Sequence, residues 1–147
     1  MTKHSGSLMN NPLTVRIYSF GYHFSGIPED TSMNNGGFVF DCRFLPNPGR
    51  EAKFSSLTGK DGEVIEYLSK HEIVDRFLEQ VFKIINMAVE NYRSRGFTNL
   101  MISFGCTGGQ HRSVYCAEKC AAYLKSKNIS VEVHHTEFPD LNEDQDK

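Results

Sequence analysis

An apolar segment runs into a glycine turn and then into a helical repeat, and this succession constrains the fold more than any other feature. Residues 99–104 are mostly apolar and suit a strand, while residues 114–125 carry apolar side chains at helical spacing. The turn between them contains two adjacent glycines, Gly108 and Gly109. A strand followed by a helix is typical of parallel sheets, in which the helix returns the chain to the edge where the next strand begins. The segment therefore predicts an α/β protein.

Three other segments are rich in β-branched and aromatic residues and suit strands, at residues 13–20, 37–44 and 128–135. The prolines within residues 45–50 remove backbone donors and are expected to end the second of these strands. Strands that alternate with helices form right-handed crossovers and a parallel sheet. We therefore expect an α/β fold with a mostly parallel sheet of about four strands and helices packed on it.

Two helical patterns lie between the second and third strands. A short one covers residues 63–69, with Asp61 in position to cap its first turn, and a long one covers residues 72–95 and ends at Gly96. Apolar residues of the long helix recur at spacings of three and four, which predicts one buried stripe. The expected stripe consists of Ile73, Phe77, Val81, Ile84, Ile85 and Ala88.

The glycine turn itself carries residue types that bind phosphate. Gly108 and Gly109 let backbone N–H groups converge on one point without a Cβ in the way. The helix that follows contributes more unpaired N–H groups and the positive end of its dipole. Arg112 adds a planar cation that fits two phosphate oxygens, and Thr107 and Ser113 add hydroxyl donors. Because ligands of parallel sheets bind at the carboxyl ends of the strands, we expect a phosphate-binding loop at this edge.

A second interpretation of the same loop is catalytic. Cys106, Arg112 and Ser113 have the C-x5-R-[ST] spacing of cysteine-dependent phosphatases, in which the cysteine attacks phosphorus as a thiolate. A helix N-terminus and a nearby guanidinium favour the thiolate form. The mechanism also needs an acid for the leaving oxygen, and Asp41 is the only candidate that we can nominate. A third possibility is that the turn serves packing alone, with Cys106 as a small buried hydrophobe.

Residues near other strand ends extend this constellation. Asp41 and Arg43 lie two apart in the second strand and share one of its faces, where Arg43 could reach a phosphate and Asp41 an amine or a sugar hydroxyl. The alternative is an internal Asp–Arg pair that fixes the strand end. His111 either contacts the ligand or caps the following helix. His134 and His135 point to opposite faces of the last strand, and we expect both at the surface.

The composition limits the partners. The chain has 147 residues and suits one domain, expected at residues 12–136 between a disordered N-terminus at 1–11 and an acidic, disordered tail at 137–147. The formal net charge is −2 and the basic residues are scattered, which disfavours RNA as a partner. No apolar run is long enough to span a membrane, and we expect no membrane partner.

The cysteines and the missing nucleotide motifs limit the compartment and the cofactors. The four cysteines form no C-x-x-C pair and no regular framework, which indicates reduced thiols and a cytoplasmic protein. Their spacing gives no support to a zinc site, so we expect no metal. The sequence has no G-x-x-x-x-G-K-[ST] motif, so a P-loop nucleotide site is not expected and no cofactor is implied.

Three motifs together resemble the C-terminal domain of RapZ proteins, which are RNase adaptors related to the YvcJ nucleotide-binding proteins. They are FDCRFLPNP at residues 40–48, LTG at 57–59 and the highly specific GCTGGQHRSV at 105–114. The resemblance extends over nearly the whole globular part. It implies a sensor of glucosamine-6-phosphate, with a part in small-RNA binding. The residues that it implies around the ligand are Asp41, Arg43, Cys106, Thr107, Gly108, Gly109, His111 and Arg112.

Two departures from the RapZ pattern bear on function. Many RapZ proteins have a histidine after Leu-Pro-Asn-Pro, whereas this chain has Gly49 and Arg50, so a ligand contact is lost or is replaced by Arg50. The acidic end also differs from the basic tail expected where RapZ meets RNA. Our leading hypothesis is a regulatory domain that binds a phosphorylated amino sugar through the turn, with Ser113 and Arg50 among the contacts. A cysteine phosphatase and an RNA or protein adaptor are the alternatives.

Overall fold

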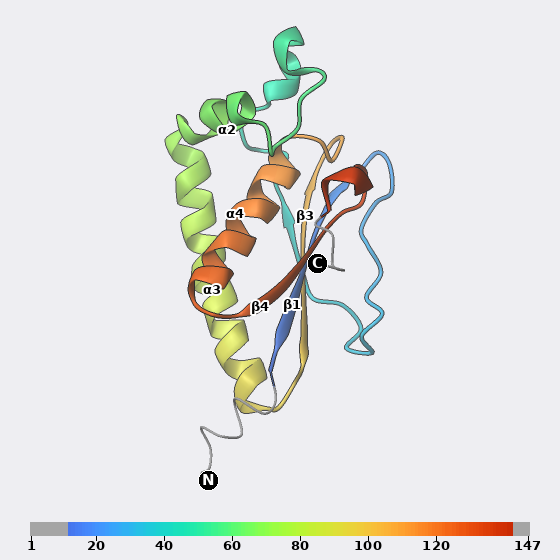
Figure 1. Ribbon diagram of the computed structural model, residues 1–147, viewed down its shortest axis with the longest axis vertical. Helices are drawn as coiled ribbons and strands as arrows, with labels where there is room; N and C mark the ends of the chain where they lie inside the picture. Colours follow the sequence, from blue (N-terminus) through green and yellow to red (C-terminus); the bar gives the residue numbers. More distant parts are fainter. Residues whose placement is uncertain (1–11, 143–147) are drawn as a thin grey trace.

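A parallel sheet organises residues 12–142, the part of the chain that the computed structural model describes. Its strands in chain order are β1 (Thr14–Gly21), β2 (Phe38–Asp41), β3 (Asn99–Cys106) and β4 (Ser130–His135). They lie side by side in the order β2-β3-β1-β4, and each neighbouring pair is parallel (Figure 1). The expected α/β fold with a parallel sheet is confirmed, and β1 lies in the interior of the sheet.

Helices cover one face of this sheet. The helices are α2 (Gly62–Ser69), α3 (Glu72–Ser94) and α4 (Arg112–Ser126), and short 3-10 turns are η1 (Pro48–Arg50), η2 (Ala52–Phe54) and η3 (Pro139–Leu141). Figure 1 shows α3 and α4 on the same side of the strands, while the segment between β1 and β2 lies on the opposite side. The arrangement leaves the carboxyl ends of the strands at one edge of the molecule, where the loop before α4 lies.

The core lies between the sheet and the two long helices. Alternate residues of β1 and β3 point toward the helices, as the period of two along a strand requires. The helices meet them with the apolar side of an amphipathic surface. Fully or almost fully buried residues of this core include Val15, Ile17, Leu100, Ile102, Phe104, Val81, Ile85, Ala117 and Leu124.

The buried side of α3 differs from the expected stripe. Val81 and Ile85 are buried as predicted, but Ile73 is 41% exposed and Phe77 is only partly buried. The buried residues of this helix are Val74, Leu78, Val81, Ile85 and Val89. Apolar residues cover more of the surface of α3 than the sheet buries. Spacing alone therefore selected Ile73 and Phe77 for burial, one residue before the buried Val74 and Leu78.

The second strand is shorter than the expected residues 37–44. It ends at Asp41, because the Asp41 carboxylate accepts a hydrogen bond from the Arg43 backbone N–H at 2.9 Å and the chain then turns. Asp61 occupies the N-cap position of α2 as predicted, but its side chain does not cap the helix. Its Oδ2 accepts the Thr58 N–H at 2.7 Å instead, so the carboxylate closes the preceding turn.

The structure also differs from the expected boundary of the domain at residue 136. Glu137 makes several hydrogen bonds to β1 and the turn after it, and η3 follows it, so the expectation of a disordered tail is wrong for residues 137–142. The composition of this segment is acidic, but one of its carboxylates has specific backbone partners. Residues 1–11 and 143–147, where the other terminal expectations fall, lie outside the described residues.

Candidate functional site

The loop between β3 and α4 packs closely on the end of β1. Gly109 has φ of +70°, a left-handed conformation that favours glycine. A Cβ on Gly109 would lie 2.7 Å from the Gly21 nitrogen and 2.8 Å from the Phe20 carbonyl carbon. A Cβ on Gly21 would lie 2.7 Å from the Gly108 carbonyl carbon. Glycine is therefore required on both sides of this contact, and the backbone of the loop is fixed by it.

Some polar backbone groups of this loop have hydrogen-bond partners and others do not. The carbonyls of Thr107 and Gln110 accept hydrogen bonds from the His23 and Gly59 N–H groups at 3.2 and 2.9 Å. By contrast, the N–H groups from Thr107 to His111 have no hydrogen-bond partner within residues 12–142. The loop immediately precedes the N-terminus of α4, whose dipole favours negative charge. The backbone therefore offers several donors to an anion, while the carbonyls of Thr107 and Gln110 are occupied.

Arg112 is 5% exposed and is held in place through one of its nitrogens. Its Nη1 donates to the backbone carbonyls of Arg43 at 2.7 Å and Leu45 at 3.1 Å. Neither Nε nor Nη2 has a partner among the described residues. The Arg43 and Leu45 carbonyls thus orient the guanidinium, and its remaining donors can bind an anion.

His111 and Gln110 hold the segment before α2 against the loop. The Phe54 carbonyl lies 2.9 Å from His111 Nε2, and because a carbonyl only accepts, Nε2 is the donor of this hydrogen bond. Gln110 Nε2 donates to the carbonyls of Ser55 and Leu57 at 2.9 and 2.8 Å. His111 occupies the N-cap position of α4 without a capping bond from its side chain, so the capping alternative is wrong.

Cys106 and Ser113 form a buried pair at the base of the loop. The Cys106 thiol donates to Ser113 Oγ at 3.2 Å, and the Ser113 N–H donates to Cys106 Sγ at 3.4 Å. Ser113 is fully buried, so its hydroxyl interacts with the thiol rather than lining the cavity above it. A thiolate at this position would retain the N–H donor and could accept from the hydroxyl.

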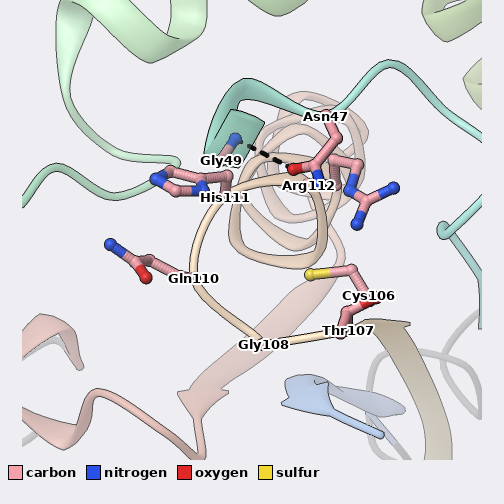
Figure 2. A pocket seen from close by; sticks show the side chains of 8 residues that line it. All are labelled: Asn47, Gly49, Cys106, Thr107, Gly108, Gln110, His111 and Arg112. Atoms are coloured by element: carbon pink, nitrogen blue, oxygen red, sulfur yellow. Dashed lines mark hydrogen bonds between the residues drawn. The ribbon is translucent and has the colours of Figure 1, made fainter. Parts of the chain in front are cut away.

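Together these residues surround a cavity of about 190 Å³ (Figure 2). Figure 2 shows Arg112 and Cys106 at one side of it and His111 and Gln110 at the other. The lining residues are Asn47, Gly49, Cys106, Thr107, Gly108, Gln110, His111 and Arg112. Asn47 and Gln110 were not predicted from the sequence, although both belong to the motifs that carried the RapZ resemblance. The Asn47 side chain accepts the Gly49 N–H at 2.9 Å, which fixes the wall opposite the glycine turn.

Asp41 and Arg43 lie beside this cavity and pair with each other. Arg43 donates to both carboxylate oxygens, with Nη2 2.7 Å from Asp41 Oδ2, and its guanidinium lies 3.8 Å from the centre of the Tyr22 ring. The hydrogen bonds from Arg43 lower the pKa of Asp41, to which the Arg112 charge also contributes. Neither residue lines the cavity, nor does Arg50, which is exposed in η1. Their contact with a ligand stays a prediction.

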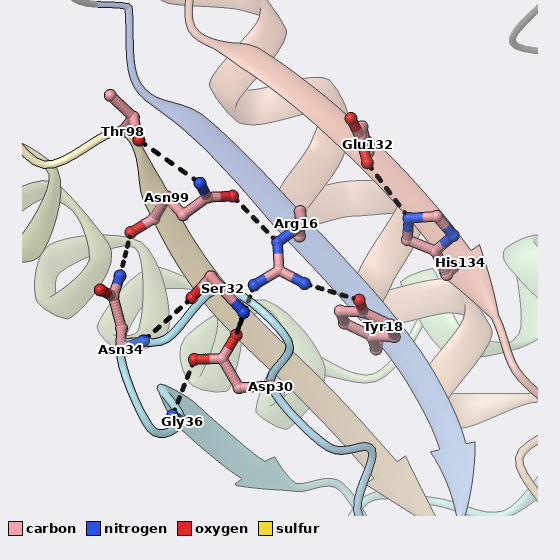
Figure 3. Close-up of polar contacts among 10 residues, drawn as sticks. All are labelled: Arg16, Tyr18, Asp30, Ser32, Asn34, Gly36, Thr98, Asn99, Glu132 and His134. Atoms are coloured by element: carbon pink, nitrogen blue, oxygen red, sulfur yellow. Dashed lines mark hydrogen bonds and ion pairs between the residues drawn. The ribbon is translucent and has the colours of Figure 1, made fainter.

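Two polar clusters, one buried and one partly buried, lie away from the cavity and were missed by sequence reasoning. His135, expected at the surface, is fully buried, with Nδ1 2.7 Å from Ser19 Oγ and Nε2 2.7 Å from Glu118. The histidine faces α4, which covers that side of β4, and the expectation is wrong for this reason. Arg16 and Asp30 form the second cluster with Tyr18 and Asn99 (Figure 3). No local pattern marks either cluster, because their members are far apart in the sequence.

Some classes of site are absent from the described residues. Residues 12–142 contain no group of three or more His, Cys, Asp or Glu side chains that could hold a metal ion. No helix in the same part of the chain is both long and apolar enough to cross a bilayer.

Comparison with known proteins agrees with the three sequence motifs. A model of the family described as the RapZ C-terminal domain matches residues 13–139, which include every element described above except the last part of η3. The chain belongs to the RapZ C-terminal domain family.

Curated relatives share this stretch over less than half of their own length. A nucleotide-binding protein of Thermotoga neapolitana is 44% identical over 134 residues, which cover 90% of this chain and 46% of the relative. The nucleotide-binding protein YvcJ of Bacillus subtilis is 38% identical over 138 residues, covering 94% of this chain and 44% of YvcJ. A nucleotide-binding protein of Acidobacterium capsulatum is 40% identical over 127 residues, 86% of this chain and 39% of the relative.

Proposed function

We propose that the cavity between the glycine turn and the segment of Asn47 and Gly49 binds a phosphorylated amino sugar, with glucosamine-6-phosphate as the first candidate, and that binding serves regulation. The observation that carries this proposal is the convergence of free donors at one cavity. Nε and Nη2 of Arg112 and the N–H groups from Thr107 to His111 lack partners in residues 12–142. A phosphate group would accept from both sets of donors.

The expected energies are sufficient for a metabolite sensor. Each charge-assisted hydrogen bond contributes roughly 1.5–3 kcal/mol, and the helix N-terminus contributes roughly 0.3–1 kcal/mol more. A few such contacts support micromolar affinity, which corresponds to about −8 kcal/mol. The Asn47 and Gln110 amides and the His111 ring lie at the same cavity and offer polar groups to a sugar. The phosphate would supply affinity, and these groups would select the sugar.

A cysteine phosphatase is the second candidate, favoured by the two contacts between Ser113 and Cys106 Sγ. This mechanism needs a general acid that could protonate the leaving oxygen, and Asp41 is poorly suited to that role. The hydrogen bonds from Arg43 lower the pKa of Asp41, so this carboxyl is ionised at neutral pH and has no proton to give to a leaving oxygen. The structure therefore favours binding over hydrolysis at this cavity.

Calorimetric titration of glucosamine-6-phosphate, with inorganic phosphate assayed in the same cell, tests both candidates. We expect saturable binding without phosphate release. Arg112→Met should weaken binding by about 100-fold, which is about 2.7 kcal/mol, because it removes the free guanidinium donors. Arg76→Met on α3 is the matched control, since it removes an exposed arginine far from the loop in sequence.

The outcomes separate the candidates. Equal affinity of the Arg112→Met and Arg76→Met proteins, with both folded by circular dichroism, would contradict the proposed site. Phosphate release that disappears in Cys106→Ser would establish the phosphatase instead. Retention of structured RNA at low salt would support the adaptor role that the RapZ resemblance implies.

A further inference from the structure

Glu137 is bound to the turn that follows β1. One carboxylate oxygen, Oε2, accepts the backbone N–H groups of Gly21 and Ser25, each at 3.0 Å. The other, Oε1, accepts the Ser25 hydroxyl at 3.0 Å. The preceding residue, Thr136, is fixed to β1 by hydrogen bonds from its N–H and hydroxyl to the Ser19 carbonyl, at 3.0 and 2.8 Å. The carboxylate of Glu137 is therefore fixed by the turn after β1, and its backbone is fixed beside β1 through Thr136.

The same side chain lies against the phosphate-binding loop. A Cβ on Gly109 would lie only 2.5 Å from Glu137 Cγ, so the glycine and the methylene chain of Glu137 are in direct contact. Gly21, which donates to Glu137, also packs on the loop, since a Cβ on Gly21 would lie 2.7 Å from the Gly108 carbonyl carbon. The turn after β1 and Glu137 thus form a single surface on which Gly108 and Gly109 rest.

We propose that Glu137 is a positioning residue for the phosphate-binding loop. It does not line the cavity. It acts by holding the Gly21–Ser25 turn and by filling the space beside Gly109, so that the N–H groups of the loop keep the conformation that binds an anion. The inference rests on the proposed function, and it makes the segment after β4 a support of the ligand site.

Charge repulsion and loop positioning predict opposite changes in phosphate affinity when Glu137 is removed, which makes the inference testable. A carboxylate near an anion site repels the anion, so removing the charge of Glu137 should strengthen phosphate binding if charge alone mattered. If Glu137 positions the loop, removing it should weaken binding. The sign of the change in affinity therefore separates the two effects.

The experiment measures the affinity of glucosamine-6-phosphate for the full chain and its variants by calorimetry. Glu137→Ala should raise the dissociation constant by about tenfold, equivalent to about 1.4 kcal/mol. Asp140→Ala removes an equal charge three residues away, from an exposed side chain without a hydrogen bond or ion pair in residues 12–142, and should leave affinity near the wild-type value. Glu137→Gln keeps an acceptor oxygen and should recover part of the loss.

A second readout does not depend on the ligand. Amide resonances of Gly108 and Gly109 in the free protein should shift in Glu137→Ala and stay in place in Asp140→Ala. Unchanged or tighter binding by Glu137→Ala, or unshifted glycine resonances, would overturn the inference. If wild-type protein does not bind glucosamine-6-phosphate at all, the proposed function fails, while the resonances still decide whether Glu137 positions the loop.

Discussion

Two arginines, Arg16 near one end of the sheet and the buried Arg112 near the other, differ in how their charge is satisfied. Arg16 on β1 uses all of its nitrogens, donating to Asn99, Tyr18 and Asp30, and its ion pair with Asp30 measures 2.6 Å. Arg112 is more deeply buried but donates through one nitrogen to neutral carbonyls. No carboxylate lies within 4.0 Å of it in the part of the chain that the structure describes.

The difference separates an arginine whose charge is compensated by a carboxylate from one that keeps donors without partners in residues 12–142. A buried cation is costly unless an opposite charge or several hydrogen bonds compensate it. Asp30 provides that compensation inside the molecule for Arg16, and its side chain is only 2% exposed. Arg112 has only part of such compensation, and an incoming phosphate would supply the rest.

The largest expected effect comes from removing the internal counter-charge of Arg16. Asp30→Asn should reduce the free energy of unfolding by about 3–5 kcal/mol, because it leaves a buried guanidinium unpaired. Urea denaturation measures this loss. The double variant Arg16→Met, Asp30→Leu should be more stable than Asp30→Asn alone, since no buried charge then remains. If Asp30→Asn has wild-type stability, the contrast between the two arginines is wrong.

The same pair predicts a pH dependence. Burial opposes ionisation of Asp30, but hydrogen bonds from Gly36, Ser32 and Arg16 outweigh it and hold the pKa of the carboxyl well below its ordinary value. Its stabilisation is therefore fully present above about pH 4, the pKa of an unfolded aspartate, and is lost as pH falls through the lower native pKa. The stability difference between wild type and Asp30→Asn should shrink in acid. A constant difference from neutral pH to strong acid would contradict this.

We expect an intermediate loss of stability from substituting glycines, one from each of the two regions. Gly109 and Gly36 both have positive φ, but only Gly109 is surrounded by other atoms where a Cβ would be. Gly109→Ala should therefore cost about 2–4 kcal/mol through backbone strain and overlap together. Gly36→Ala should cost about 1 kcal/mol through strain alone. Thermal denaturation of both variants tests this order, and equal losses would show that the loop before α4 is less tightly packed than described.

We expect the smallest change in stability from the exposed Asp41–Arg43 ion pair, which contrasts with the Arg16–Asp30 pair. Asp41 and Arg43 pair at 2.7 Å, but both side chains are more than two-fifths exposed. Exposed ion pairs contribute little, because water screens the charges and both side chains lose freedom. Asp41→Asn should leave the melting temperature almost unchanged. A loss as large as that of Asp30→Asn would mean that exposure does not separate the two pairs.

The sequence predicted the glycine turn and its neighbouring elements better than it predicted the polar clusters elsewhere in the fold. The strand, glycine turn and helix are contiguous, so residues such as Gly109 and Arg112 could be placed from their order alone. The contact of Asp30 with Arg16 spans 14 positions, and that of His135 with Ser19 spans 116. Glu137 binds backbone groups 112 and 116 positions away. No local period encodes such contacts. The carboxylate of Glu137 in an acidic stretch is the clearest case, since composition suggests a solvated end and only the fold reveals its backbone partners.

The position of β1 inside the sheet has a consequence for how the chain folds. This strand is made before its neighbour β4, and the paired residues Thr14 and Ser130 are 116 positions apart. Contacts of such long range slow folding, because the chain must close a large loop before it gains them. During synthesis on the ribosome, one edge of β1 therefore stays open until β4 emerges. A nascent chain stalled before residue 130 would expose that edge, and we expect it to be the form that chaperones recognise.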